Sequence, residues 1–95
     1  MSATGAVLID FGSTPTEEAT VVVSDAGVAS GSQIEAFIQA SDLAAASNNE
    51  NAHEVASASM RITCTAKSAG VSFTLVAMCI FGLATDTFNL QWVRV

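Results

Sequence analysis

The chain has 95 residues, and nine acidic residues against three basic ones give it a net charge of −6. A chain without a basic patch lacks the electrostatic footprint for binding nucleic acid or an anionic membrane surface. Only 13% of its residues are charged and 51% are hydrophobic, whereas about 25% charged residues is usual in a soluble protein. We therefore expect one small domain, residues 1–95, whose surface is partly covered by other protein.

The N-terminal part predicts two short strands. Residues 6–11 form an apolar run that ends at Gly12, because glycine favours turn conformations. Residues 1–5 are expected to form a short arm ahead of this strand. Residues 17–24 place apolar side chains at every second position, which is the period of a half-buried strand.

The middle of the chain allows more than one reading. Residues 32–46 have good helix propensity, but residues 34–39 also alternate, and we expect a strand there because the rest of the chain is β. The polar residues 41–51 predict an exposed loop. Alternation resumes over residues 53–63, which predicts a further strand.

The clearest pattern lies in residues 70–95. Large apolar residues occupy every second position of two segments: Val71, Phe73, Leu75, Ala77, Cys79 and Phe81, then Phe88, Leu90 and Trp92. We expect these segments to form the central strand pair, with Trp92 packed in the core rather than stacked on a sugar. About six short strands separated by turns predict an all-β, compact antiparallel β-sandwich.

The sequence offers little for catalysis, and we expect no enzyme activity. The only histidine, His53, precedes Glu54, and its surroundings match no metal-ligand motif, although loop carboxylates and amides leave a cation site open. No nucleophile elbow or phosphate-binding glycine loop is present. We expect no cofactor and no metal. Cys64 and Cys79 are expected to be free, because a hairpin between them would hold them far apart.

A secretion signal or membrane span is not expected. The first residues lack the basic segment and long apolar core of a signal peptide. The most apolar window, residues 71–84, is shorter than the roughly 20 residues that span a bilayer. We therefore expect the chain to fold in a cytoplasm.

Several short motifs follow one another along nearly the whole chain: IDFGSTP at 9–15, GSQIEAFI at 31–38, HE at 53–54, GVSFT at 70–74 and TFNLQWV at 87–93. In this order they resemble the motifs of small bacteriophage virion proteins. The order is also similar to that of H-type lectin-like domains. Those domains are six-stranded antiparallel β-sandwiches that commonly form trimers and bind N-acetylgalactosamine.

The resemblance implies a capsid decoration, or cement, protein on the surface of the virion. Such a protein binds the major capsid protein and stabilises the contacts between its subunits. The resemblance also implies a jelly-roll or H-type lectin-like sandwich that forms a homotrimer. A tail or fibre module that binds carbohydrate is the alternative, and a non-viral binding domain is the third hypothesis.

Partner-binding residues are expected outside the core, together with the backbone of edge strands. We place them in the N-terminal arm, in the polar loop and at the end of the last strand: Ser2, Thr4, Asp42, Asn48, Asn49, Glu50 and Arg94. Arg94 is expected to pair with a carboxylate, and a neighbouring subunit is one place where that carboxylate could lie.

Overall fold

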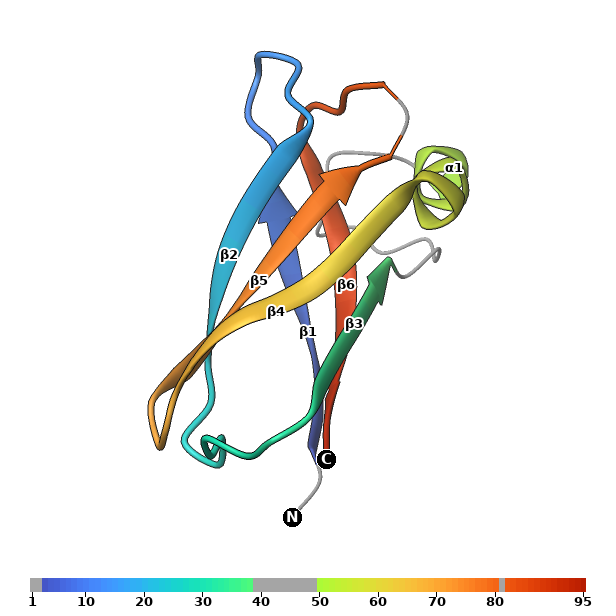
Figure 1. Ribbon diagram of the computed structural model, residues 1–95. Coiled ribbons are helices and arrows are strands. Elements are labelled where there is room, and N and C mark those ends of the chain that lie inside the picture. Colours follow the sequence, from blue (N-terminus) through green and yellow to red (C-terminus); the bar gives the residue numbers. More distant parts are fainter. Residues whose placement is uncertain (1–2, 39–49, 81) are drawn as a thin grey trace.

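The structure is a computed structural model that describes residues 3–38, 50–80 and 82–95. The described residues form six strands and one helix: β1 (Ala3–Asp10), β2 (Glu18–Ser24), β3 (Ile34–Ile38), α1 (Glu50–Ser59), β4 (Met60–Ser68), β5 (Ser72–Cys79) and β6 (Thr87–Arg94). The strands build two three-stranded antiparallel sheets that pack against each other (Figure 1). The predicted all-β sandwich is therefore confirmed.

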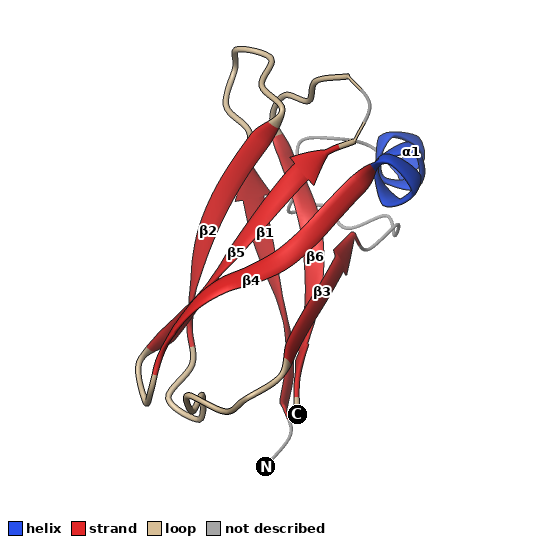
Figure 2. Ribbon diagram, in the orientation of Figure 1, coloured by secondary structure: helices blue, strands red, loops and turns tan. Residues whose placement is uncertain are grey.

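Each sheet has one of the last two strands at its centre. The strand order is β1-β6-β3 in one sheet and β2-β5-β4 in the other, and Figure 2 shows α1 at one end of this arrangement. The C-terminal part of the chain thus supplies both central strands. The predicted pairing of these two strands with each other is wrong, because the chain crosses to the other sheet after β5 instead of making a hairpin.

The core lies between the sheets and consists of the alternating apolar residues. Phe73 and Leu75 of β5 are at most 1% exposed, and Leu90 of β6 is fully buried. The rings of Phe73 and Trp92 meet edge to face with their centroids 5.1 Å apart. Trp92 is only 8% exposed, so it is a packing residue, as the alternation predicts.

The N-terminal strand starts earlier than the sequence indicates. β1 pairs with β6 from Ala3, which lies opposite Arg94. Gly5 lies under the indole of Trp92, where a Cβ would come within 2.6 Å of Cζ2. The prediction of a free arm is wrong for residues 3–5, because they complete the ladder along the end of β6. Residues 1–2 lie outside the described part of the chain.

Helix α1 replaces the first half of the strand predicted over residues 53–63. The chain is helical up to Ser59 and extended from Met60 onward. Ala56 is 4% exposed, and Ala52, four residues earlier, is partly buried against the same core. The small residues of this segment fit a helical spacing of four as well as a period of two, and the helix propensity of alanine favours the helix. Residues 39–49, most of the predicted loop, lie outside the described residues.

Candidate functional site

Arg94 and Asp25 form the most buried charged pair among the described residues. Arg94 is 6% exposed, and its Nε donates to Oδ2 of Asp25 at 2.6 Å. The Gly27 backbone N–H donates to Oδ1 of the same carboxylate at 3.0 Å. The hydrogen bond from Arg94 lowers the pKa of Asp25, partial burial opposes this effect, and the Gly27 N–H adds to the lowering.

This pair corrects the role expected for Arg94. The predicted pairing with a carboxylate is confirmed, but the carboxylate belongs to Asp25 of the same chain rather than to a neighbouring subunit. The guanidinium therefore lies inside one end of the sandwich. It links the two sheets through Asp25.

The other residues predicted to bind a partner fall into two groups. Thr4 is exposed on edge strand β1. Glu50 is the first residue of α1 instead of the end of a loop. The remaining predicted residues lie outside the described part of the chain: Ser2, Asp42, Asn48 and Asn49. The described residues thus do not form one site. Thr4 lies beside Arg94 in the β1–β6 ladder, but its side chain is exposed whereas Arg94 is buried, and Glu50 belongs to α1.

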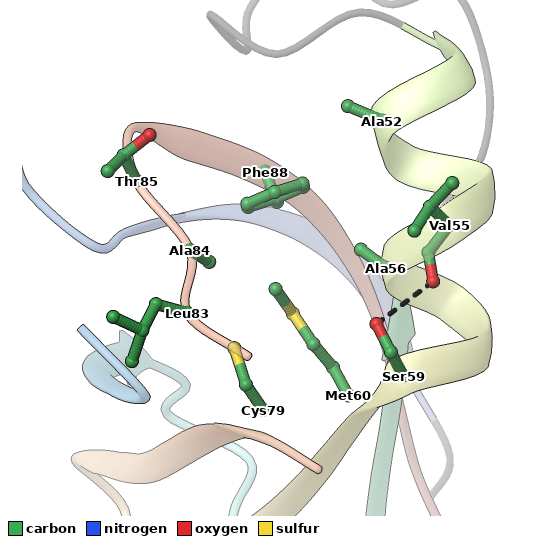
Figure 3. Close-up of a pocket in the computed structure, with 10 residues that line it drawn as sticks. All are labelled: Ala52, Val55, Ala56, Ser59, Met60, Cys79, Leu83, Ala84, Thr85 and Phe88. Carbon is green, nitrogen blue, oxygen red and sulfur yellow. Dashed lines mark hydrogen bonds between the residues drawn. The ribbon is translucent and has the colours of Figure 1, made fainter. Parts of the chain in front are cut away.

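A pocket of about 280 Å³ lies beneath α1 at the end of the sandwich (Figure 3). It is lined mainly by apolar side chains from α1, from the ends of β4 and β5, and from the segment before β6: Ala52, Val55, Ala56, Ser59, Met60, Cys79, Leu83, Ala84, Thr85 and Phe88. The Ser59 hydroxyl donates to the carbonyl of Val55 at 3.0 Å. Partial burial raises the pKa of the Cys79 thiol, and the negative charge of Glu17 adds to this effect. A protonated thiol in an apolar pocket has little nucleophilic power.

The remaining chemistry-bearing groups are dispersed. Among the described residues, no three or more His, Cys, Asp or Glu side chains gather where they could hold a metal ion. Cys64 and Cys79 are free thiols. In the same part of the chain, no helix has the length and apolar character that a membrane crossing requires.

The outer face of the β2-β5-β4 sheet carries almost no charge. Val22 is 61% exposed and Met78 is 46% exposed on this face. In the strand register, Thr20 and Thr63 lie on either side of Val76. We call this surface the threonine-valine face: Thr20, Val22, Thr63, Thr74, Val76 and Met78.

Two charged residues lie beside one end of the threonine-valine face. Glu18 and Arg61 are the register partners of Met78, one on each side. The partner-binding residues expected from the sequence, which lie in loops and near the termini, and the backbone of edge strands do not include the side chains of this face. The sequence does carry a signal for this uncharged face. The outward positions of β2, β5 and β4 hold mainly uncharged residues, where an exposed strand usually carries lysine and glutamate.

No family model, no curated protein and no solved structure matches this chain.

Proposed function

We propose that this chain is a bacteriophage capsid decoration protein that binds the outside of the assembled shell. In this role it stabilises contacts between major capsid subunits and has no catalytic activity. The observation that carries the proposal is the threonine-valine face, an uncharged surface with Val22 and Met78 exposed. The motif order that resembles small virion proteins indicates which partner covers it.

The composition of the threonine-valine face suits burial against another protein. The cores of protein interfaces are poor in charged residues, and charge gathers at their rims. Glu18 and Arg61 stand at such a rim, beside Met78. A protein that binds only the assembled shell stabilises that state by its binding free energy. Many copies on one shell add their contacts, so a weak single interface is enough.

The carbohydrate-binding alternative has less support from the described residues. Trp92 is packed against Phe73 and is only 8% exposed, so its ring face is not open to a sugar. Phe37 is the large aromatic side chain that is exposed in the described part, at 51%. The homotrimer also stays a prediction, and light scattering of the purified protein measures it directly.

Two measurements test the proposed function. Quantitative mass spectrometry of purified virions should find the protein in at least tens of copies, as symmetric decoration requires, and only a few copies would contradict it. In the second measurement, purified protein is added to shells that lack it. Val22→Glu should abolish binding, and Val71→Glu should leave it intact, because Val71 is equally exposed at 61% but lies at the turn before β5.

A further inference from the structure

Strands β3 and β4 are edge strands of different sheets and run along the same side of the sandwich (Figure 1). β3 pairs only with β6 and β4 only with β5, so no ladder joins β3 to β4 in the described part of the chain. An edge strand presents backbone donors and acceptors to which another strand can add. This side of the molecule therefore has two open edges.

The register of the β3–β6 ladder identifies the open groups of β3. Gln33 and Val95 exchange both backbone hydrogen bonds, at 3.1 and 2.9 Å. In an antiparallel ladder such bonded pairs alternate with unbonded ones. The backbone N–H and C=O groups at the intervening positions therefore point away from β6: Ile34, Ala36 and Ile38.

The same reasoning applies to β4. The N–H of Ile80 donates to the carbonyl of Ser59 at 2.7 Å, whereas the N–H of Cys79 donates to the carbonyl of Glu17 at 2.8 Å. β5 thus bonds alternately to β4 and to β2. The backbone groups of β4 that point away from β5 belong to three residues: Met60, Ile62 and Cys64.

A groove of about 520 Å³ lies between these two edges. Ile34 and Ala36 line it from β3, and Ile62 and Cys64 line it from β4. All four side chains pack against the core but stay partly exposed. Phe37, at the rim of the groove, is 51% exposed. The apolar core is therefore incompletely covered at the place where the backbone edges are open.

The groove has a limited length. Near one end, Lys67 Nζ donates to the carbonyl of Ser32 at 2.5 Å, which connects the far part of β4 to the turn before β3. At the other end α1 lies next to the end of β3 (Figure 1). Strand β3 between these points has 5 residues. The groove thus fits a short segment in the extended conformation, which rises about 3.3 Å per residue.

We propose that the β3–β4 groove binds an extended segment of a partner protein that pairs antiparallel with the open edge of β3. The segment adds a fourth strand to the β1-β6-β3 sheet. In an extended segment, the backbone N–H and C=O groups of every second residue point to the same side. Ile34 and Ala36, two residues apart in β3, present their open N–H and C=O groups with the same spacing. Alternate apolar side chains of the segment cover Ile34 and Ile62. A basic side chain on its outer face meets Glu35 at the rim, in a chain with a net charge of −6.

This site lies along the edge of the sandwich and shares only Thr63 with the threonine-valine face. The inference therefore stands whether or not the chain decorates a capsid. Strand addition of this kind takes its affinity from main-chain hydrogen bonds and its selectivity from alternate side chains. The partner is thus defined by an extended, alternating apolar and polar segment with at least one basic residue.

The test uses the full chain and the acetylated, amidated peptide Lys-Val-Thr-Val-Lys-Val-Thr. Amide hydrogen exchange followed by NMR reads the edge directly. We expect the peptide to slow exchange of the Ile34 and Ala36 amides by at least about tenfold, and to leave the Ala6 amide on the far edge of the same sheet unchanged. N-methylation of the valines should abolish the effect, because their N–H groups face β3. N-methylation of the threonines should preserve it.

A pair of proline variants tests the same edge from the protein side. Ala36→Pro removes a backbone N–H that points away from β6 at the open edge of β3. Ala6→Pro removes the equivalent N–H at the edge of β1. Neither substitution removes a hydrogen bond to β6. We expect Ala36→Pro to weaken peptide binding about tenfold and Ala6→Pro to have no effect. If Ala36→Pro does not fold, Phe37→Ala should still weaken binding, by about threefold.

Three results would overturn the proposal. One is unchanged exchange at Ile34 and Ala36 with millimolar peptide. Another is equal protection by the valine-methylated peptide. The third is protection of these amides that grows with protein concentration in the absence of peptide, which would assign the edge to a second copy of this chain instead of a partner segment.

Discussion

Nε of Arg94 lies 2.6 Å from Oδ2 of Asp25, and this contact joins the two sheets at one end of the sandwich. Arg94 ends the central strand of one sheet, and Asp25 directly follows β2 of the other. The two residues are 69 positions apart in the sequence. The pair therefore fixes the position of one sheet relative to the other by a contact that no local pattern encodes.

Acid should lower the stability of the folded protein, because it protonates Asp25 in this pair. The pKa of Asp25 is lowered in the folded protein, while an unfolded chain has an aspartate pKa of about 3.9. Such a group stabilises the folded state above its unfolded pKa, and the stabilisation is lost as the pH falls through the folded pKa. We expect the Tm of the wild type to fall more than that of Asp25→Asn between about pH 5 and pH 2. Thermal melts followed by circular dichroism measure this, and parallel pH profiles would contradict it.

Gly27 cannot be replaced without disturbing the same pair. A Cβ at this position would collide with Nη2 of Arg94. We expect Gly27→Ala to destabilise the protein by about 1–3 kcal/mol, the usual cost of overpacking. Gly31→Ala is the matched control, because nothing lies within 4 Å of a Cβ there. Urea unfolding of both variants measures the difference, and equal midpoints would show that the Arg94 side chain gives way at no cost.

Substitution of Gly5 should destabilise the protein as much as substitution of Gly27, although Gly5 lies close to the N-terminus. Its missing side chain makes room for the Trp92 ring, whose Cζ2 would lie 2.6 Å from a Cβ. We expect Gly5→Ala to lower the free energy of unfolding by about 1–3 kcal/mol and to shift the fluorescence of Trp92. Thr4→Ala, at an exposed neighbouring position, should change neither quantity. A Gly5→Ala protein with native stability would mean that the indole is not held against β1.

The Cys79 thiol should react slowly. Partial burial and the charge of Glu17 raise its pKa, and the thiolate is the reactive species. In a Cys64→Ser variant, which isolates Cys79, we expect alkylation by iodoacetamide at pH 8 to be at least about tenfold slower in the folded than in the denatured protein. Adding Glu17→Gln should speed the folded reaction. Equal rates in the folded and denatured states would contradict the environment assigned to this thiol.

The strands with large apolar residues could be predicted from the sequence alone. Phe73 and Leu75, or Phe88 and Leu90, have side chains whose burial decides the conformation of the segment. Segments of small residues could not be predicted in this way. The alanines and serines of α1 fit a strand and a helix equally. The need for glycine at position 5 becomes apparent only in the folded structure, where the Trp92 ring lies against it.

The structural setting of the predicted partner-binding residues could not be predicted from the sequence for a related reason. Thr4 and Arg94 were chosen by their places near the chain ends, but β1 and β6 pair those ends with each other. Whether a polar side chain faces solvent then depends on its register and on partners distant in the sequence. The backbone edges of β3 and β4 are also invisible in a one-dimensional pattern, because strand order is a property of the whole fold.

The pairing of Ala3 with Arg94 also bears on how the chain acquires its structure. The β1-β6-β3 sheet cannot begin to assemble before its central strand, the last in the sequence, has been made. During synthesis β1 and β3 therefore stay unpaired until β6 has been made. The loop that must close spans most of the chain for β1 and more than half of it for β3, and the entropy cost of this closure opposes both pairings. Sandwiches built from such distant contacts fold in milliseconds to seconds, and mutations in β6 should slow folding more than mutations in β2.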